Sequence, residues 1–120
     1  MKKLRNDRRR LQHIIDLSAR AVQEYKALNG AVLPNDDLRY FGFIRLIQTV
    51  GEACRKVSRE LQDANPQVAW GEIIGFRNVL VHDYDELDEE IIWQVLAEEL
   101  PILHQQITDI LAALPTVTDE

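Results

Sequence analysis

Apolar residues recur at three- and four-residue intervals along most of this 120-residue chain, and no stretch shows the alternation of a half-buried β-strand. The spacing predicts helices over residues 7–28, 37–61 and 66–82, and a fourth that begins at Asp85 or Asp88 and includes Leu111. Asn29-Gly30 supplies a stop for the first helix. We therefore expect an all-α fold in one domain at residues 1–115, followed by a short tail at 116–120.

Two prolines help to place the third and fourth helices. Asn65 is expected to cap the third helix, with Pro66 at its first position, where a missing N–H costs nothing. Pro101 falls between the two apolar halves of the fourth helix, so that helix should be kinked there.

The charges of the chain are unevenly distributed. A net charge of −6 argues against a general nucleic-acid binder. Residues 1–10 nevertheless hold six bases against one acid, and residues 83–99 hold eight acids and no base. Both runs could simply be solvated surfaces. If an RNA is bound, the bases available for its phosphates are Arg8, Arg9, Arg10, Arg45, Arg55, Lys56 and Arg59.

Other sequence features exclude several classes of protein. The single cysteine, Cys54, lies on the apolar stripe of the second helix and is expected to be a buried structural thiol. No segment has the length of a membrane span, and no apolar signal region follows the first residues, so we expect a cytoplasmic protein. No metal site or cofactor is expected, because the three histidines fall on separate helices or helix ends: His13, His82 and His104.

The third helix is apolar on more than one side. On a helical wheel, Arg77 lies in the middle of an apolar stripe, and Asn78 and His82 lie about 100 to 140° away from it. Phe76 and Val79 occupy the back of the helix. Such a helix needs two covers, one from its own bundle and one from another molecule, and we expect a second copy of the chain to supply the other. The stripe consists of Trp70, Ile73, Ile74, Leu80 and Val81.

Arg77 and His82 have ordinary explanations when each is taken alone. Arg77 could be a salt-bridged or snorkelling arginine, and His82 could interact with the dipole at a helix C-terminus. Together they suit phosphodiester chemistry, because a guanidinium that keeps its proton can hold the anion while an imidazole moves protons. Glu52 could pair with Arg55 along its own helix or with Arg77, and the wheel does not decide between them.

The motif R-x4-H-x-Y, formed here by Arg77, His82 and Tyr84, is embedded in a longer pattern that resembles the HepT-like toxins of the HEPN ribonuclease superfamily. The resemblance covers roughly residues 36–114. It rests on the run Gly75 to Tyr84 together with Gly51-Glu52-Ala53, Pro66, Trp70, Leu87-Asp88, Ile91-Ile92-Trp93 and Leu100-Pro101.

The resemblance implies an up-and-down antiparallel four-helix bundle that dimerises and brings two motifs into one cleft. It further implies a metal-independent endoribonuclease, the toxin of a toxin–antitoxin pair, which cleaves RNA by attack of the 2′-hydroxyl. His82 would be the general acid or base, Arg77 the charge clamp, and Asn78 a supporting residue that orients the phosphate or His82. A nucleotidyltransferase antitoxin would neutralise the toxin by transferring AMP to Tyr84. The alternatives are a non-catalytic helical module that docks such a nucleotidyltransferase and aids its nucleotide binding, and a plain dimeric scaffold.

Overall fold

The computed structural model describes residues 1–116, and within them every regular element is helical. This confirms the all-α class. The α-helices are α1 (Lys2–Ala27), α2 (Leu38–Arg55), α3 (Arg59–Ala64), α4 (Trp70–His82), α5 (Glu89–Gln94) and α6 (Leu100–Ala113). A 3₁₀ turn, η1 (Tyr84–Glu86), follows α4, and a π-helical turn, η2 (Val95–Glu99), joins α5 to α6.

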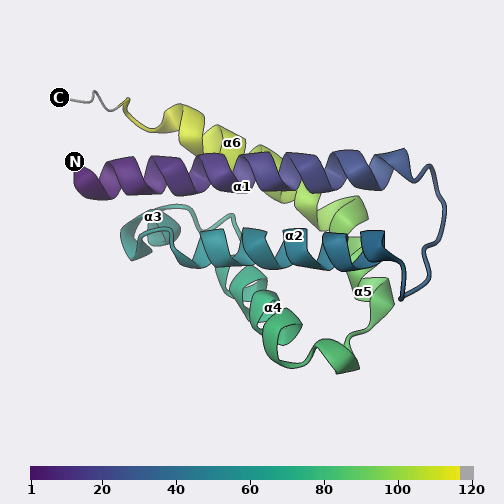
Figure 1. Ribbon diagram of the computed structural model, residues 1–120. Coiled ribbons are helices and arrows are strands. Elements are labelled where there is room, and N and C mark those ends of the chain that lie inside the picture. Colours follow the sequence, from purple (N-terminus) through teal and green to yellow (C-terminus); the bar gives the residue numbers. More distant parts are fainter. Residues whose placement is uncertain (117–120) are drawn as a thin grey trace.

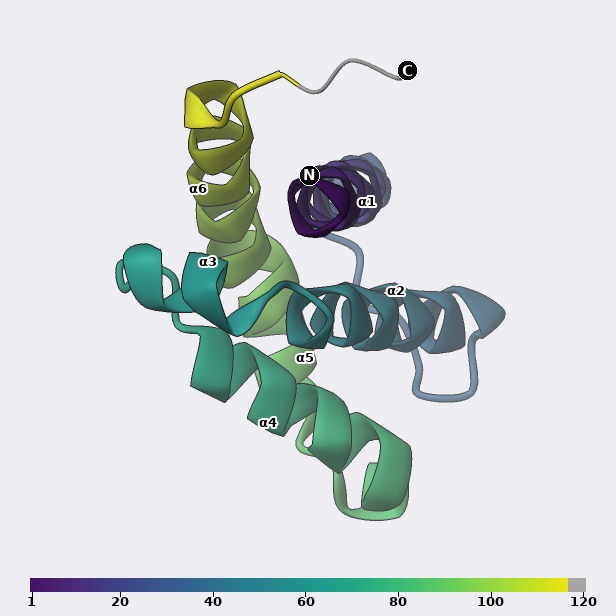
Figure 2. The same cartoon turned by 90° about the vertical axis from the view of Figure 1, so that its left-hand side faces the viewer.

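The long helices pack in a chain of contacts rather than around one axis. Figure 1 shows α1 and α2 side by side and antiparallel, with α6 against α1 and α4 on the other side of α2. Figure 2, viewed from the end where the chain starts, shows α6 and α4 diverging. The helix α4 therefore has α2 as its main support.

The core lies where α1, α2, α5 and α6 meet, and its most enclosed side chains are aliphatic. Cys54 is fully buried there, and burial raises the pKa of its thiol to about 12. Its expected structural role fits this position. The largest fully buried side chains are Leu11, Ile14, Ile92, Leu96, Ile107, Val50, Cys54 and Ser18. None of the described helices is long and apolar enough to cross a membrane.

Hydrogen bonds from elsewhere in the chain explain why the second helix ends earlier than predicted. The expected helix 37–61 stops at Arg55, and a separate helix, α3, starts after Ser58. The buried Asp7 carboxylate of α1 accepts hydrogen bonds from the Ser58 backbone N–H, at 2.8 Å, and from its hydroxyl. The Ser58 hydroxyl in turn caps α3 by accepting from the Leu61 N–H. These bonds hold Ser58 in an extended conformation that interrupts the helix.

The start of the third helix was also predicted wrongly. Asn65 ends α3 instead of capping the next helix, and its side chain donates to the Leu61 carbonyl. Its own carbonyl accepts from the Trp70 indole N–H at 3.0 Å. Pro66 therefore lies in a turn, and α4 begins at Trp70, although its predicted end at His82 is confirmed.

The last helix is irregular just before its proline. Asp88 caps α5 by accepting from the Glu90 N–H, as one of the two predicted possibilities required. A proline ring conflicts with the carbonyl four residues earlier, which here belongs to Ala97, inside the π-helical turn η2. The wider turn accommodates Pro101, while a kink of the helix axis at Pro101 stays a prediction. Of the expected tail, residues 117–120 lie outside the described residues.

Candidate functional site

The helices α2 and α4 approach closely at Gly51, in the fourth turn of α2. Gly51 is buried, and a β-carbon added to it would lie 2.5 Å from the Arg77 Cβ and 3.3 Å from the Ile73 carbonyl oxygen. Any other residue here would push α4 away. The missing side chain lets Arg77 lie directly across the backbone of α2.

Arg77 is held in place on two sides. Its Nη2 lies 2.9 Å from Glu52 Oε2 on α2, and its Nη1 donates to Asn78 Oδ1 at 2.9 Å. Its Nε is buried and has no hydrogen-bond partner in the described part of the chain. Only 23% of the side chain is exposed. The guanidinium is therefore fixed against α2 and does not snorkel into solvent.

Glu52 is shared among three cations. Besides Arg77, it contacts Arg55 Nη2 at 2.7 Å and Lys56 Nζ at 3.9 Å. The hydrogen bond from Arg55, followed by the charges of Arg55, Arg77 and Lys56, holds the pKa of Glu52 below its ordinary value. Both pairings that the sequence left open are thus present at once. Three cations and one carboxylate leave a local charge of +2, which favours an anion beside Arg77.

His82 and Tyr84 lie where α4 ends. His82 is the last residue of α4 and is exposed. Tyr84 opens η1, is 40% exposed, and packs its ring against Phe41 of α2, with ring centroids 6.2 Å apart. Five residues along a helix correspond to about 7.5 Å and 140° of rotation, so Arg77 and His82 of one protomer project in different directions. The structure brings Arg77, Asn78 and Glu52 together but does not bring His82 to Arg77.

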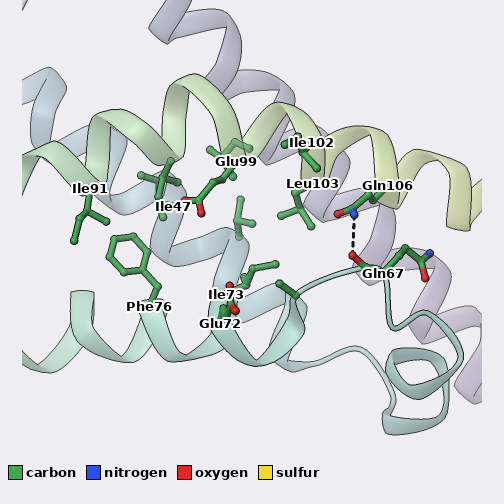
Figure 3. A pocket seen from close by; sticks show the side chains of 14 residues that line it. Ile47, Gln67, Glu72, Ile73, Phe76, Ile91, Glu99, Ile102, Leu103 and Gln106 are labelled. Carbon is green, nitrogen blue, oxygen red and sulfur yellow. Dashed lines mark hydrogen bonds between the residues drawn. The ribbon is translucent and has the colours of Figure 1, made fainter.

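A groove of about 440 Å³ separates α4 from α5, η2 and α6. Figure 3 shows Phe76 and Ile91 at one end, and a hydrogen bond of 2.9 Å from Gln106 Nε2 to the Gln67 carbonyl at the other. Phe76 packs against the core from this groove, so the wheel was wrong to group it with Val79, which is exposed. The two residues differ because Phe76 faces the groove between α4 and the helices α5 and α6, whereas Val79 faces solvent.

No group of three or more histidine, cysteine, aspartate or glutamate side chains among residues 1–116 is arranged to hold a metal ion. His13 is exposed near the middle of α1, and His104 is half-buried on α6. The metal-free mechanism stays a prediction.

Sequence reasoning missed the extent to which Glu52 organises this site. The available signal was Gly51: a glycine inside an amphipathic helix indicates a close approach by another backbone, and its neighbour Glu52 then lies at that contact. The helical wheel describes one helix at a time and does not indicate which partner covers its outer face.

The sequence profile of the family described as Ribonuclease HepT-like matches residues 11–110. A protein named "Putative RNase TTE0752" from Caldanaerobacter subterraneus subsp. tengcongensis is 29% identical over 101 residues, which cover 84% of this chain and 90% of that protein. "Putative RNase MJ1380" from Methanocaldococcus jannaschii is 25% identical over 97 residues, 81% of this chain and 89% of that protein.

A third relative, "Probable ribonuclease HepT" from Thermococcus cleftensis, is 28% identical over 68 residues, which cover 57% of this chain and 62% of that protein. No solved structure gives a significant match. The family profile covers most of the chain, including the whole Arg77 to Tyr84 motif, and the chain therefore belongs to the HepT-like ribonuclease family of the HEPN superfamily.

Proposed function

We propose that this protein is a metal-independent endoribonuclease that acts as the toxin of a toxin–antitoxin pair. The observation that carries the proposal is the fixed, net positive cluster at Arg77, in the helix that ends at an exposed His82, in a chain of the HepT-like family. The names of the relatives, which refer to ribonuclease activity, support the same reaction.

In the proposed reaction the 2′-hydroxyl oxygen of the RNA bonds to the adjacent phosphorus while the bond from phosphorus to the 5′-oxygen breaks. A neutral imidazole takes the 2′-hydroxyl proton, and an imidazolium gives a proton to the departing 5′-oxygen. The products are a 2′,3′-cyclic phosphate and a free 5′-hydroxyl. Arg77 would stabilise the charge that develops on the phosphoryl oxygens, and Asn78 would fix the guanidinium that does so.

A second copy of the chain would complete the site. One protomer offers a single His82, which projects away from Arg77, whereas two copies facing each other across α4 supply two imidazoles and two clamps. Val79 and Val81 of α4 are exposed and provide apolar surface for such a contact. We expect a homodimer in solution.

Tyr84 is the proposed control point. Its oxygen would attack the α-phosphorus of ATP in the antitoxin, a nucleotidyltransferase, with release of pyrophosphate and formation of a tyrosyl-AMP phosphodiester. Partial exposure of Tyr84 at the start of η1 supports this role. An added nucleotide would bring a negative charge to the end of α4 and compete with RNA for the cationic cluster.

The decisive experiment measures RNA cleavage by purified wild type, Arg77→Ala and His82→Ala, with circular dichroism to show that each variant is folded. We expect the wild type to cut RNA in the presence of a chelator, to leave a 2′-deoxy strand intact, and to inhibit growth when expressed. Both variants should lose these activities. Undiminished cleavage by His82→Ala would refute the mechanism. A wild type that cuts nothing but binds a nucleotidyltransferase would favour the non-catalytic docking module.

A further inference from the structure

The face of α2 that bears Glu52 carries cations from Arg45, in the middle of the helix, to Arg55 and Lys56 at its end. Relative to Arg45, Phe41 lies about 40° away around the helix and Glu52 about 20° away, so the three side chains share one face. Phe41 touches Tyr84 at one end of this face, and Glu52 touches Arg77 further along. Arg45 is therefore positioned between the contacts that define the proposed site.

The cations on this face have few anionic partners. Arg45 is exposed and forms no ion pair within residues 1–116. Arg55 and Lys56 are also exposed, and both share the single carboxylate of Glu52 with Arg77. Free N–H donors thus remain on this face from Arg45 to Lys56.

The line of charge continues beyond α2. Lys56 also lines an open hollow of about 420 Å³ together with Lys2 and Lys3 from the first turn of α1. Asp7 lines it too, but its carboxylate is buried and occupied by Ser58. Figures 1 and 2 show the start of α1 and the last turn of α2 at the same end of the molecule.

Charge counting distinguishes this surface from the rest of the chain. Its six cations are opposed by three acids, Glu52, Asp7 and the Glu60 that pairs with Lys3, which leaves +3 where the whole chain carries −6. We name this surface the α2 strip and define it by Lys2, Lys3, Arg45, Arg55, Lys56 and Arg77.

We infer that the α2 strip binds the backbone of single-stranded RNA on both sides of the scissile phosphate. Arg45 contacts a phosphate on the Tyr84 side of Arg77, and Arg55, Lys56 and the lysines of α1 contact phosphates on the other side. The strip recognises phosphodiesters and not bases, because it is made of long, exposed cationic side chains. This inference rests on the proposed function and specifies how its substrate lies.

The test uses the full chain and an RNA whose 2′-hydroxyls are methylated, so that binding is measured without cleavage. Fluorescence anisotropy at several salt concentrations gives the slope of log affinity against log salt. Each lost phosphate contact should reduce the magnitude of that slope by about 0.7 for a single strand. We expect this reduction in Arg45→Gln and in Lys56→Gln, and about 1.4 in the double variant.

Lys26→Gln is the matched control, because Lys26 is an exposed lysine in the last turn of α1, away from the strip, and its loss changes the net charge equally. It should leave the slope unchanged. Single-stranded DNA of the same sequence should bind with a similar slope and remain uncut, since the strip contacts only phosphates. If Arg45→Gln and Lys56→Gln had the same slope as Lys26→Gln, the inference that the α2 strip binds phosphates would be refuted.

Failure of the strip and failure of the proposed function give different results. If the wild type cuts RNA and the two strip variants bind like the control, the strip is wrong and the ribonuclease remains. If His82→Ala still binds the methylated RNA through the strip but the wild type cuts nothing, the strip stands and the chemistry is wrong. A wild type that binds neither the methylated RNA nor the single-stranded DNA would contradict both the RNA-binding role of the strip and the proposed ribonuclease function.

Discussion

Replacing Gly51 by alanine should destabilise the protein even though alanine is the better helix former. The new methyl carbon would lie 2.5 Å from the Arg77 Cβ, whereas carbon atoms in contact sit about 3.5 to 4.0 Å apart, so α4 must retreat by about 1 Å. Overpacking of this kind costs about 1 to 3 kcal/mol. The gain in helix propensity, about 1 kcal/mol, opposes it.

Gly42→Ala is the matched control, since Gly42 lies in the same helix and a β-carbon there meets nothing within 4 Å. Both variants share the propensity gain, so the difference in their free energies of unfolding isolates the overpacking. We expect Gly42→Ala to be more stable than the wild type and Gly51→Ala to be about 1 to 3 kcal/mol less stable than Gly42→Ala.

Urea titration at one protein concentration measures this difference, which corresponds to roughly 4 °C in Tm per kcal/mol for a chain of this size. The same retreat would stretch the 2.9 Å contact between Arg77 and Glu52, so RNA cleavage by Gly51→Ala should fall by up to about 100-fold. Equal stabilities for the two alanine variants would refute the close approach of α4 and α2 as the reason for glycine here.

Three further predictions concern other parts of the molecule. Asp7→Ala leaves the Ser58 N–H without its acceptor and should cost about 1 to 3 kcal/mol in urea titration, whereas Asp16→Ala, at an exposed position of the same helix, should cost little. Burial raises the pKa of Cys54 from 9.0 to about 12, so above about pH 9 the folded state keeps a thiol proton that the unfolded state loses. The free energy of unfolding should therefore fall as pH rises above about 9, and it should fall less in Cys54→Ala. Tyr84→Phe should still cut RNA but receive no AMP when co-expressed with the antitoxin, which mass spectrometry would detect, and AMP on another residue would contradict the proposed control.

Local signals predicted the helices well where the ends are set by neighbouring residues. Asn29 and Gly30 adopt φ values of 52° and 84°, the left-handed conformation that ends a helix, as their sequence indicates. Asp88 caps α5 through a residue two positions away. Such ends depend only on a few consecutive residues and can be predicted from sequence.

Ends that depend on distant residues could not be predicted this way. The apolar stripe of the second helix continues through Val57 and Leu61, so periodicity alone extends the helix past its true end. The break is determined by Asp7, which is 51 residues from Ser58 in the sequence. The same reasoning applies to Asn65, whose carbonyl is occupied by the Trp70 indole.

The candidate site was predictable in its residue types but not in its arrangement. The motif predicted Arg77, His82 and Tyr84 as candidates, and the helical wheel left the partner of Glu52 undecided. The face of α2 that bears Glu52 is where α4 packs, which only the tertiary arrangement reveals. The same holds for Arg45, which the sequence offers as one of several candidate bases. Its position between Phe41, which contacts Tyr84, and Glu52, which contacts Arg77, is the reason we include it in the α2 strip.

The contacts of Glu52 also determine which substitutions test chemistry and which test folding. When Arg77 is replaced by alanine, Glu52 keeps Arg55 and Lys56 as partners, so no carboxylate is left without a cation. Within residues 1–116, Glu52 is the one carboxylate that pairs with Arg77, and the Arg77 Nε is buried there without a hydrogen bond. Replacing Glu52 therefore breaks this pair, which is costly. Loss of cleavage in Arg77→Ala can therefore be attributed to the missing clamp, whereas the same loss in Glu52→Ala would combine a displaced Arg77 with a loosened α4.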